Sequence, residues 1–267
     1  MSKKNYYEDI KFVKRAKFRG LKALGIFLIL GVFVCGTYFL SVIFSNTVSV
    51  TGSIFSLKKN KSINKSYYAI CFGKYDNMED ARTTANNLLS IGAGGYILKY
   101  ENKYNVLGAI YLNESDANSI IDSNKKYNYN GMTYELSVFK INIDLNKKFY
   151  SKFGNDSSII YDATKVLVNT IDELYANVML LDKGDISNII LANKVNSLDS
   201  SIVVESKKIE ALVLSNSNSN LSSIYEKFLK MEKVLNNLTN TLLVSDKPNA
   251  SVRYSMLEFV VMLSEMK

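Results

Sequence analysis

An uncharged, apolar run at Ala23–Phe44 constrains this chain more than any other feature of its sequence. The run contains no Asp, Glu, Lys or Arg, and it is as long as the roughly 20 apolar residues that a helix needs to cross a bilayer core of about 30 Å. A buried core helix seldom runs this long without a charged face, and the apolar part of a signal peptide usually has only about 7–15 residues. The run therefore predicts a transmembrane helix that stays uncleaved as an anchor.

The charges around this run predict its orientation. Residues 1–22 carry eight of the 33 basic residues and two of the 25 acidic ones, so the remainder of the chain has a net charge of only +2. Basic residues beside one end of a span hold that end in the cytoplasm. We expect a basic cytoplasmic tail at residues 1–22 in a single-pass cell-membrane protein, with everything after Phe44 outside the cytoplasm. The nearly neutral outer part has no basic stripe, which argues against a nucleic-acid partner.

An internal repeat follows a Ser-, Asn- and Lys-rich linker at residues 45–66. Residues 67–141 match themselves when the sequence is shifted by 36 positions. The matched pairs are Tyr68 and Tyr104, Ile70 and Val106, Tyr75 and Tyr111, Asn77 and Asn113, Asp80 and Asp116, Ala81 and Ala117, and Gly95 and Gly131. Each half predicts a strand, a helix that begins after an Asn, and a second strand. The expected order is β-α-β-β-α-β, in which two helices cover one face of a four-stranded sheet and leave the other face open.

The two halves resemble the sporulation-related repeat, or SPOR domain. Tyr68–Tyr75 (Tyr-Ala-Ile-Cys-Phe-Gly-Lys-Tyr) is similar to the family's apolar–Gln–apolar trio, which Gly, a small residue and an aromatic residue follow. Tyr104–Tyr111 (Tyr-Asn-Val-Leu-Gly-Ala-Ile-Tyr) is similar to the family's Tyr-Arg-Val-x-Val-Gly-Pro-Phe. Cys71 stands at the family's Gln position and Asn105 at its Arg position. The resemblance covers residues 67–141, and it implies that the open sheet face binds peptidoglycan glycan strands stripped of their stem peptides.

Side-chain alternation divides the first strand between two faces. Tyr67 and Cys71 fall on one face, and Tyr68 and Ile70 fall on the other. We expect the second pair to face the two helices and the first pair to lie on the open face. The predicted glycan-binding residues on the open face are Tyr67, Cys71, Asn105, Leu107 and Glu135, with Ser137 beside them. The alternative is a SPOR-like domain that has lost its affinity for glycan and binds protein instead.

Residues 157–267 have the apolar spacing of amphipathic helices. Apolar residues recur every three or four positions in four successive stretches, separated by residues 183–185, residues 215–220 and a turn at Pro248. Short connections between helices of this length predict an antiparallel four-helix bundle, which follows a polar connection at residues 142–156. The alternative is coiled-coil pairing with another chain, so this segment is a candidate for binding a protein partner or for self-association.

The sequence offers few of the groups that catalysis uses. It has no His, which rules out Ser–His and Cys–His pairs within the chain. It also has no Gly-rich phosphate-binding loop, no nucleophile elbow and no cluster of metal-ligating residues. We therefore predict no catalytic residues, no metal, no cofactor and no enzyme activity. A wall enzyme that uses carboxylates alone is a third, remaining hypothesis.

The predicted fold class is α+β: a transmembrane helix, a SPOR-like β-α-β-β-α-β domain at residues 67–141 and a helical bundle at residues 157–267. The predicted function is that of a membrane-anchored cell-envelope protein that binds peptidoglycan during cell division or sporulation. The alternative function is that of a non-enzymatic scaffold or assembly protein, which acts through protein contacts of the helical domain without binding glycan.

Overall fold

The computed structural model describes residues 61–267, apart from residues 125, 130–131, 216–217 and 267. The tail, the apolar run Ala23–Phe44 and the linker up to residue 60 lie outside the described residues. Among the helices that are described, none is both long enough and apolar enough to cross a membrane.

The structure corrects the fold class predicted from the sequence. No helix of the described residues spans a membrane, and the run that was predicted to do so lies outside them. Residues 60–267 also form one compact unit, whereas the sequence predicted a sheet domain at residues 67–141 and a separate bundle at residues 157–267. What agrees with the prediction is the coarser order, a β-rich region at residues 63–145 followed by a helical region.

The β-rich region forms a four-stranded antiparallel sheet with two helices. Its elements are β1 (Ile63–Tyr75), α2 (Met78–Ser90), β2 (Tyr96–Tyr100), β3 (Lys103–Tyr111), α3 (Glu114–Ser123), β4 (Lys126–Tyr129), β5 (Met132–Glu135) and β6 (Ser137–Leu145). The strand order is β2-β3-β1-β6, and β4 and β5 form a separate hairpin between α3 and β6. The sequence predicted only one strand after the second helix, so the β4–β5 hairpin is an insertion into the split arrangement.

Local chemistry explains several of these boundaries. The Asn77 side chain accepts a hydrogen bond of 2.9 Å from the Asp80 backbone N–H, which satisfies one free amide in the first turn of α2. Glu101 and Asn102 have positive φ angles of 48° and 59°, as the two-residue turn of the β2–β3 hairpin requires. Between Ile70 and Lys74 the register of β1 against β3 shifts, which bends the strand there.

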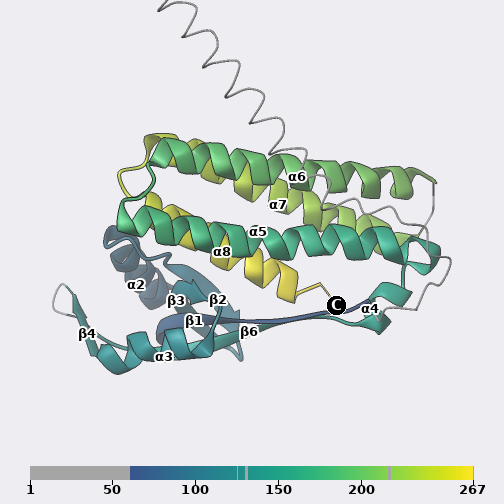
Figure 1. Cartoon of the computed structure of the whole chain (residues 1–267). Coiled ribbons are helices and arrows are strands. Elements are labelled where there is room, and N and C mark those ends of the chain that lie inside the picture. Colours follow the sequence, from purple (N-terminus) through teal and green to yellow (C-terminus); the bar gives the residue numbers. More distant parts are fainter. Residues whose placement is uncertain (1–60, 125, 130–131, 216–217, 267) are drawn as a thin grey trace, which may run out of the picture. The chain divides into compact units, whose positions relative to one another are not determined.

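The helical region continues directly from β6. Its elements are α4 (Lys147–Ser151), a 3₁₀ turn η1 (Gly154–Asp156), α5 (Ser157–Lys183), α6 (Asn188–Ser215), α7 (Ser219–Val244) and α8 (Pro248–Ser264). The four long helices run antiparallel to their neighbours and lie side by side (Figure 1). Figure 1 shows α6 and α7 as the outer layer, α5 and α8 beneath them, and then the sheet, with α2 and α3 on the sheet's other face.

Helices cover both faces of the sheet. Val106 of β3 packs with Ala85 and Leu88 of α2 in a small cluster on one face. Tyr67, Ala69 and Cys71 of β1 belong to the main core on the opposite face, which they share with the long helices. Because the main core contains residues of the sheet and of all four long helices, the sheet and the bundle are one folding unit.

Specific polar contacts join the sheet to the helices. Asp172 of α5 forms an ion pair with Lys65 of β1 and accepts a hydrogen bond of 3.3 Å from the Tyr67 hydroxyl. Arg253 of α8 forms an ion pair with Asp182 of α5 and donates a 2.6 Å hydrogen bond to the Gly92 carbonyl, between α2 and β2. These contacts fix the sheet against α5 and α8.

Candidate functional site

The sheet face that was predicted to bind glycan is the packing surface of the helices. Tyr67, Cys71 and Leu107 are 0% exposed and Asn105 is 2% exposed. Alternation assigned these residues to the correct side of the sheet, but α5 and α8 cover that side. A glycan strand has no access to these four side chains, so the predicted site is corrected.

The other predicted residues lie elsewhere. Glu135 is exposed at the end of β5, where it pairs with Lys126 across the inserted hairpin rather than lying on the four-stranded sheet. Ser137 is exposed at the start of β6, opposite Cys71 of β1. The structure therefore does not bring the predicted glycan-binding residues together on one accessible surface.

The buried members of this set have structural roles. Asn105 donates hydrogen bonds of 3.4 Å to the carbonyls of Leu98 and Lys103, which holds the β2–β3 hairpin together. The Cys71 thiol donates to the Gly73 carbonyl at 3.3 Å, and burial raises the pKa of this thiol above its usual value. Burial, followed by the nearby charge of Asp172, also raises the pKa of the Tyr67 hydroxyl. Both groups therefore stay protonated at neutral pH.

A groove remains open where α8 ends before it has covered the whole sheet. We call it the edge groove. Its walls are formed by Leu98–Tyr100 of β2, Phe139–Asn142 of β6, and Val261, Ser264 and Glu265 at the end of α8, around a volume of about 580 Å³. This volume lies within the range of roughly 300–1,000 Å³ that is usual for ligand pockets.

The two walls of the edge groove come from opposite ends of the strand order. The sheet bends far enough for the rings of Tyr100 and Phe139 to meet edge to face, with their centroids 5.4 Å apart. Tyr100 is 52% exposed, so it presents a large part of its ring to solvent. The sequence showed both aromatic residues, but nothing in it indicated that the two edges of the sheet approach each other.

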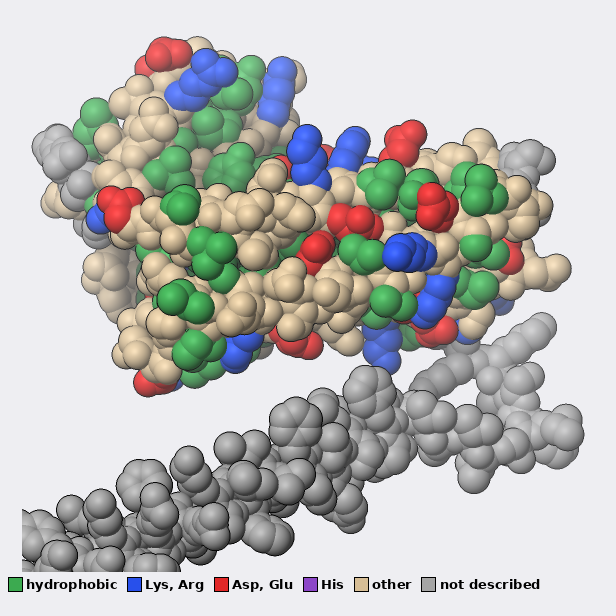
Figure 2. Space-filling view, turned by 90° about the horizontal axis from the view of Figure 1, so that it is seen from above, with side chains coloured by type: hydrophobic (Ala, Val, Ile, Leu, Met, Phe, Trp, Pro, Cys, Tyr) green, Lys and Arg blue, Asp and Glu red, His purple; other side chains and the backbone are tan. Residues whose placement is uncertain are grey.

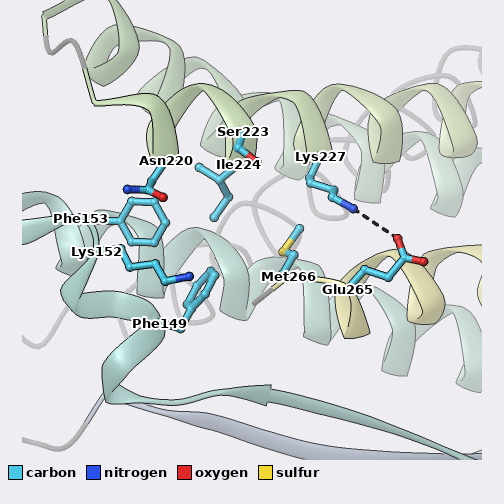
Figure 3. Close-up of a pocket in the computed structure, with 9 residues that line it drawn as sticks. All are labelled: Phe149, Lys152, Phe153, Asn220, Ser223, Ile224, Lys227, Glu265 and Met266. Carbon is cyan, nitrogen blue, oxygen red and sulfur yellow. Dashed lines mark hydrogen bonds and ion pairs between the residues drawn. The ribbon is translucent and has the colours of Figure 1, made fainter.

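The edge groove continues along β6 toward α4. A second hollow of about 360 Å³, lined by Asp144, Asn146 and Lys148 among others, shares Asn142 and Ser264 with the first. Beyond it, between α4, α7 and the end of α8, lies a smaller pocket of about 80 Å³, which Figure 3 shows with the Lys227–Glu265 ion pair at one side. This smaller pocket has room for little more than a few water molecules.

One pair of acidic side chains interacts between α6 and α7. Asp199 of α6 has its pKa raised by burial and then by the charge of Glu232 of α7, and one carboxylate oxygen of each is buried without a hydrogen-bond partner. No three His, Cys, Asp or Glu side chains come together within the described residues in a way that could hold a metal ion. The edge groove is therefore the best candidate site on geometric grounds.

Comparisons with known proteins do not identify the chain. No protein-family model matches it, and neither the search of curated proteins nor the search of solved structures found a match.

Proposed function

We propose that this protein is a non-enzymatic scaffold of the bacterial cell envelope that acts through protein–protein contacts. In this proposal Ala23–Phe44 attaches it to the cell membrane, and residues 60–267 lie outside the cytoplasm. The observation that carries the proposal is the burial of Tyr67, Cys71 and Leu107 beneath α5 and α8. The sheet face that a SPOR-like domain would offer to glycan is used here to hold the molecule together.

An exposed apolar patch at one end of the helices supports protein contacts. It consists of Ile189 and Ile190 at the start of α6 and Leu243 and Val244 at the end of α7, which are 65%, 46%, 58% and 85% exposed. Because α6 and α7 are antiparallel neighbours, these four residues lie at the same end of the bundle. Figure 2 shows hydrophobic side chains at the left end of the view, among others spread along this face. Exposed aliphatic groups of this kind are typical of interaction sites.

Localisation in cells tests the scaffold proposal. A fluorescent fusion of the full chain should lose its localisation pattern when Leu243 and Val244 are both replaced by Glu. The matched control is Leu214→Glu, because Leu214 is 84% exposed at the other end of α6 and should tolerate the charge. An unchanged pattern in the double variant, or an equal loss in the control, would contradict the proposal.

A glycan pull-down tests the competing function. Residues 60–267 contain the whole main core, so this unit can be produced alone. It can then be mixed with peptidoglycan sacculi from which an amidase has removed the stem peptides. We expect no retention above that of a control protein. The shorter fragment 67–141 is unsuitable, because without α5 and α8 it would expose the apolar face around Tyr67.

Glycan binding in the edge groove is a second candidate function. The observation that favours it is the Tyr100 ring, which is 52% exposed beside a groove of about 580 Å³ and resembles the aromatic platforms on which sugars stack. Retention of residues 60–267 on the sacculi, and its loss in Tyr100→Ser, would select this candidate over the scaffold.

A further inference from the structure

The edge groove runs along a strand edge that has no partner within the described chain. Among residues 61–266 that the structure describes, β6 pairs only with β1, and β2 pairs only with β3. The outer edges of both strands therefore carry backbone N–H and C=O groups without a partner strand. Such an edge is a template for another extended chain, which binds by main-chain hydrogen bonds.

We propose that the edge groove binds an extended, acidic segment of a partner protein, which lies along β6 as an added strand. This inference rests on the proposed scaffold function and names the partner's chemistry. The approach of Tyr100 to Phe139 places the two free edges on opposite walls of one groove. A segment that enters there pairs with one edge and is enclosed by the other.

The length of the groove fits a chain rather than a compact ligand. The hollows of about 580 and 360 Å³ share Asn142 and Ser264, and together they follow the chain from Phe139 in β6 to Asn146 directly after it. At about 3.3 Å per residue this stretch of backbone is roughly 23 Å long. It therefore accommodates about seven residues of an extended peptide.

The charges at the groove favour an acidic segment. Lys99 and Lys140 border the first hollow, and Lys148 borders the second. The acidic groups among the lining residues are Asp144 and Glu265, and Glu265 already forms an ion pair with Lys227 at 3.3 Å. The excess of positive charge attracts carboxylates and disfavours basic partners.

The charged side chains of β6 disfavour indiscriminate pairing at its free edge. The side chains of Lys140, Asn142 and Asp144 are exposed along β6, and charged residues on an edge strand oppose indiscriminate pairing. The Lys140 ammonium lies 5.7 Å from the centre of the Tyr68 ring on the neighbouring strand β1. A glycan lacks the regular series of backbone N–H and C=O groups that pairs with a strand edge, so the free edge of β6 favours peptide over sugar.

Peptide selection on the full chain in detergent micelles tests this inference. A displayed library of random ten-residue peptides should yield binders that are rich in Asp and Glu and poor in Pro. Methylation of alternate backbone nitrogens in a selected peptide should abolish binding, because it removes the donors that pair with β6. Fluorescence anisotropy with the labelled peptide measures both effects.

A matched pair of charge reversals places the binding site. Lys140→Glu should weaken binding of the selected peptide about tenfold, whereas Lys207→Glu, an exposed lysine on α6, should leave binding unchanged. The inference is overturned if no peptide is enriched, if the winners are neutral or basic, or if N-methylated peptides bind equally well. It is also overturned if Lys140→Glu removes retention on stripped sacculi instead.

The two proposals fail separately. If no peptide binds the groove but charges at Leu243 and Val244 still abolish localisation, the scaffold function stands and the groove has another role. If those charges have no effect, the scaffold function falls even when a peptide binds.

Discussion

Replacing Tyr67 tests whether the sheet and the helices are one folding unit. Tyr67 is 0% exposed on β1 and packs in the core that the sheet shares with the long helices. Truncating a buried aromatic residue to Ala costs about 3–5 kcal/mol, because the lost packing adds to the cavity that remains. A loss of this size is a large part of the roughly 5–15 kcal/mol that stabilises a typical domain.

The neighbouring residue provides a matched control. Tyr68 is the same residue type one position along β1, but it is only half-buried and lies on the opposite face. Tyr68→Ala should therefore cost about 1 kcal/mol, the typical value for a point substitution. If the Tyr67 face of the sheet were open, Tyr68→Ala would cost more stability than Tyr67→Ala, because Tyr67 would then be exposed and Tyr68 would be in the core.

The assay is urea denaturation of residues 60–267, in which circular dichroism monitors the loss of helix. The signal comes mostly from α5 to α8, whereas the substitution is in the sheet. Tyr67→Ala should lower the midpoint by about 1–2 M urea in a single transition. Tyr67→Phe keeps the ring and loses only the 3.3 Å hydrogen bond to Asp172, so it should cost about 1 kcal/mol. If the helices of Tyr67→Ala unfold at the urea midpoint of the wild type, the shared core is refuted.

Three further substitutions probe the same architecture. Gly94→Ala should destabilise the unit by about 1–3 kcal/mol in thermal melts, because a Cβ there would lie 2.9 Å from the Tyr254 backbone nitrogen of α8; a neutral result would mean that α8 does not pack this closely. Arg253→Ala should cost about 1.5–3 kcal/mol, since it removes the ion pair to α5 and the 2.6 Å hydrogen bond to the α2–β2 turn, and a wild-type melting temperature would contradict this. Asp199 has its folded-state pKa raised above the usual 3.8 by burial and then by Glu232, so its contribution favours folding at acidic pH and is lost as pH rises through the raised value. Asp199→Asn should therefore raise the urea midpoint at pH 7. It should also reduce the amount by which the free energy of unfolding rises when the pH is lowered from 7 to 4. If the pH profile of the variant matches that of the wild type, the Asp199 carboxyl is not the source of this pH dependence.

The facing of the side chains in β1 and the starts of α2 and α3 were predictable, because patterns within a few neighbouring residues determine them. Alternation correctly separated Tyr67 and Cys71 from Tyr68 and Ile70, since side-chain direction in a strand has a period of two. The matched Asn residues of the repeat correctly marked helix starts, and Asn77 caps α2 as expected. The inserted β4–β5 hairpin was missed, because its strands are only four residues long and lack a distinct alternating pattern.

The covered face was the main error, although the sequence contained a signal for it. Tyr67, Ala69, Cys71 and Leu107 are apolar residues on the face that was predicted to be open. A sheet with one solvated face alternates between apolar and polar side chains, whereas a sheet that is apolar on both faces is covered on both. The edge groove could not be predicted in this way, because it depends on the bend of the whole sheet and on where α8 ends.

The strongest evidence for one unit comes from the pattern of α8. Val252, Met256, Phe259 and Leu263 follow helical spacing along α8, and all four are buried in the main core. A second set, Tyr254, Leu257 and Val261, also follows helical spacing and contacts the sheet region: the Tyr254 ring meets Tyr96 at 5.3 Å, the Leu257 side chain approaches Gly94, and Val261 lines the edge groove beside Leu98.

A helix that is apolar around most of its circumference needs neighbours on most sides. The bundle covers only one side of α8, so a bundle of residues 157–267 alone would leave Leu257 and Val261 exposed to water. The sheet without α8 would likewise expose Tyr67 and Leu107. Each part therefore supplies the surface that the other must bury, and this mutual requirement explains why the sheet has no open face for a glycan.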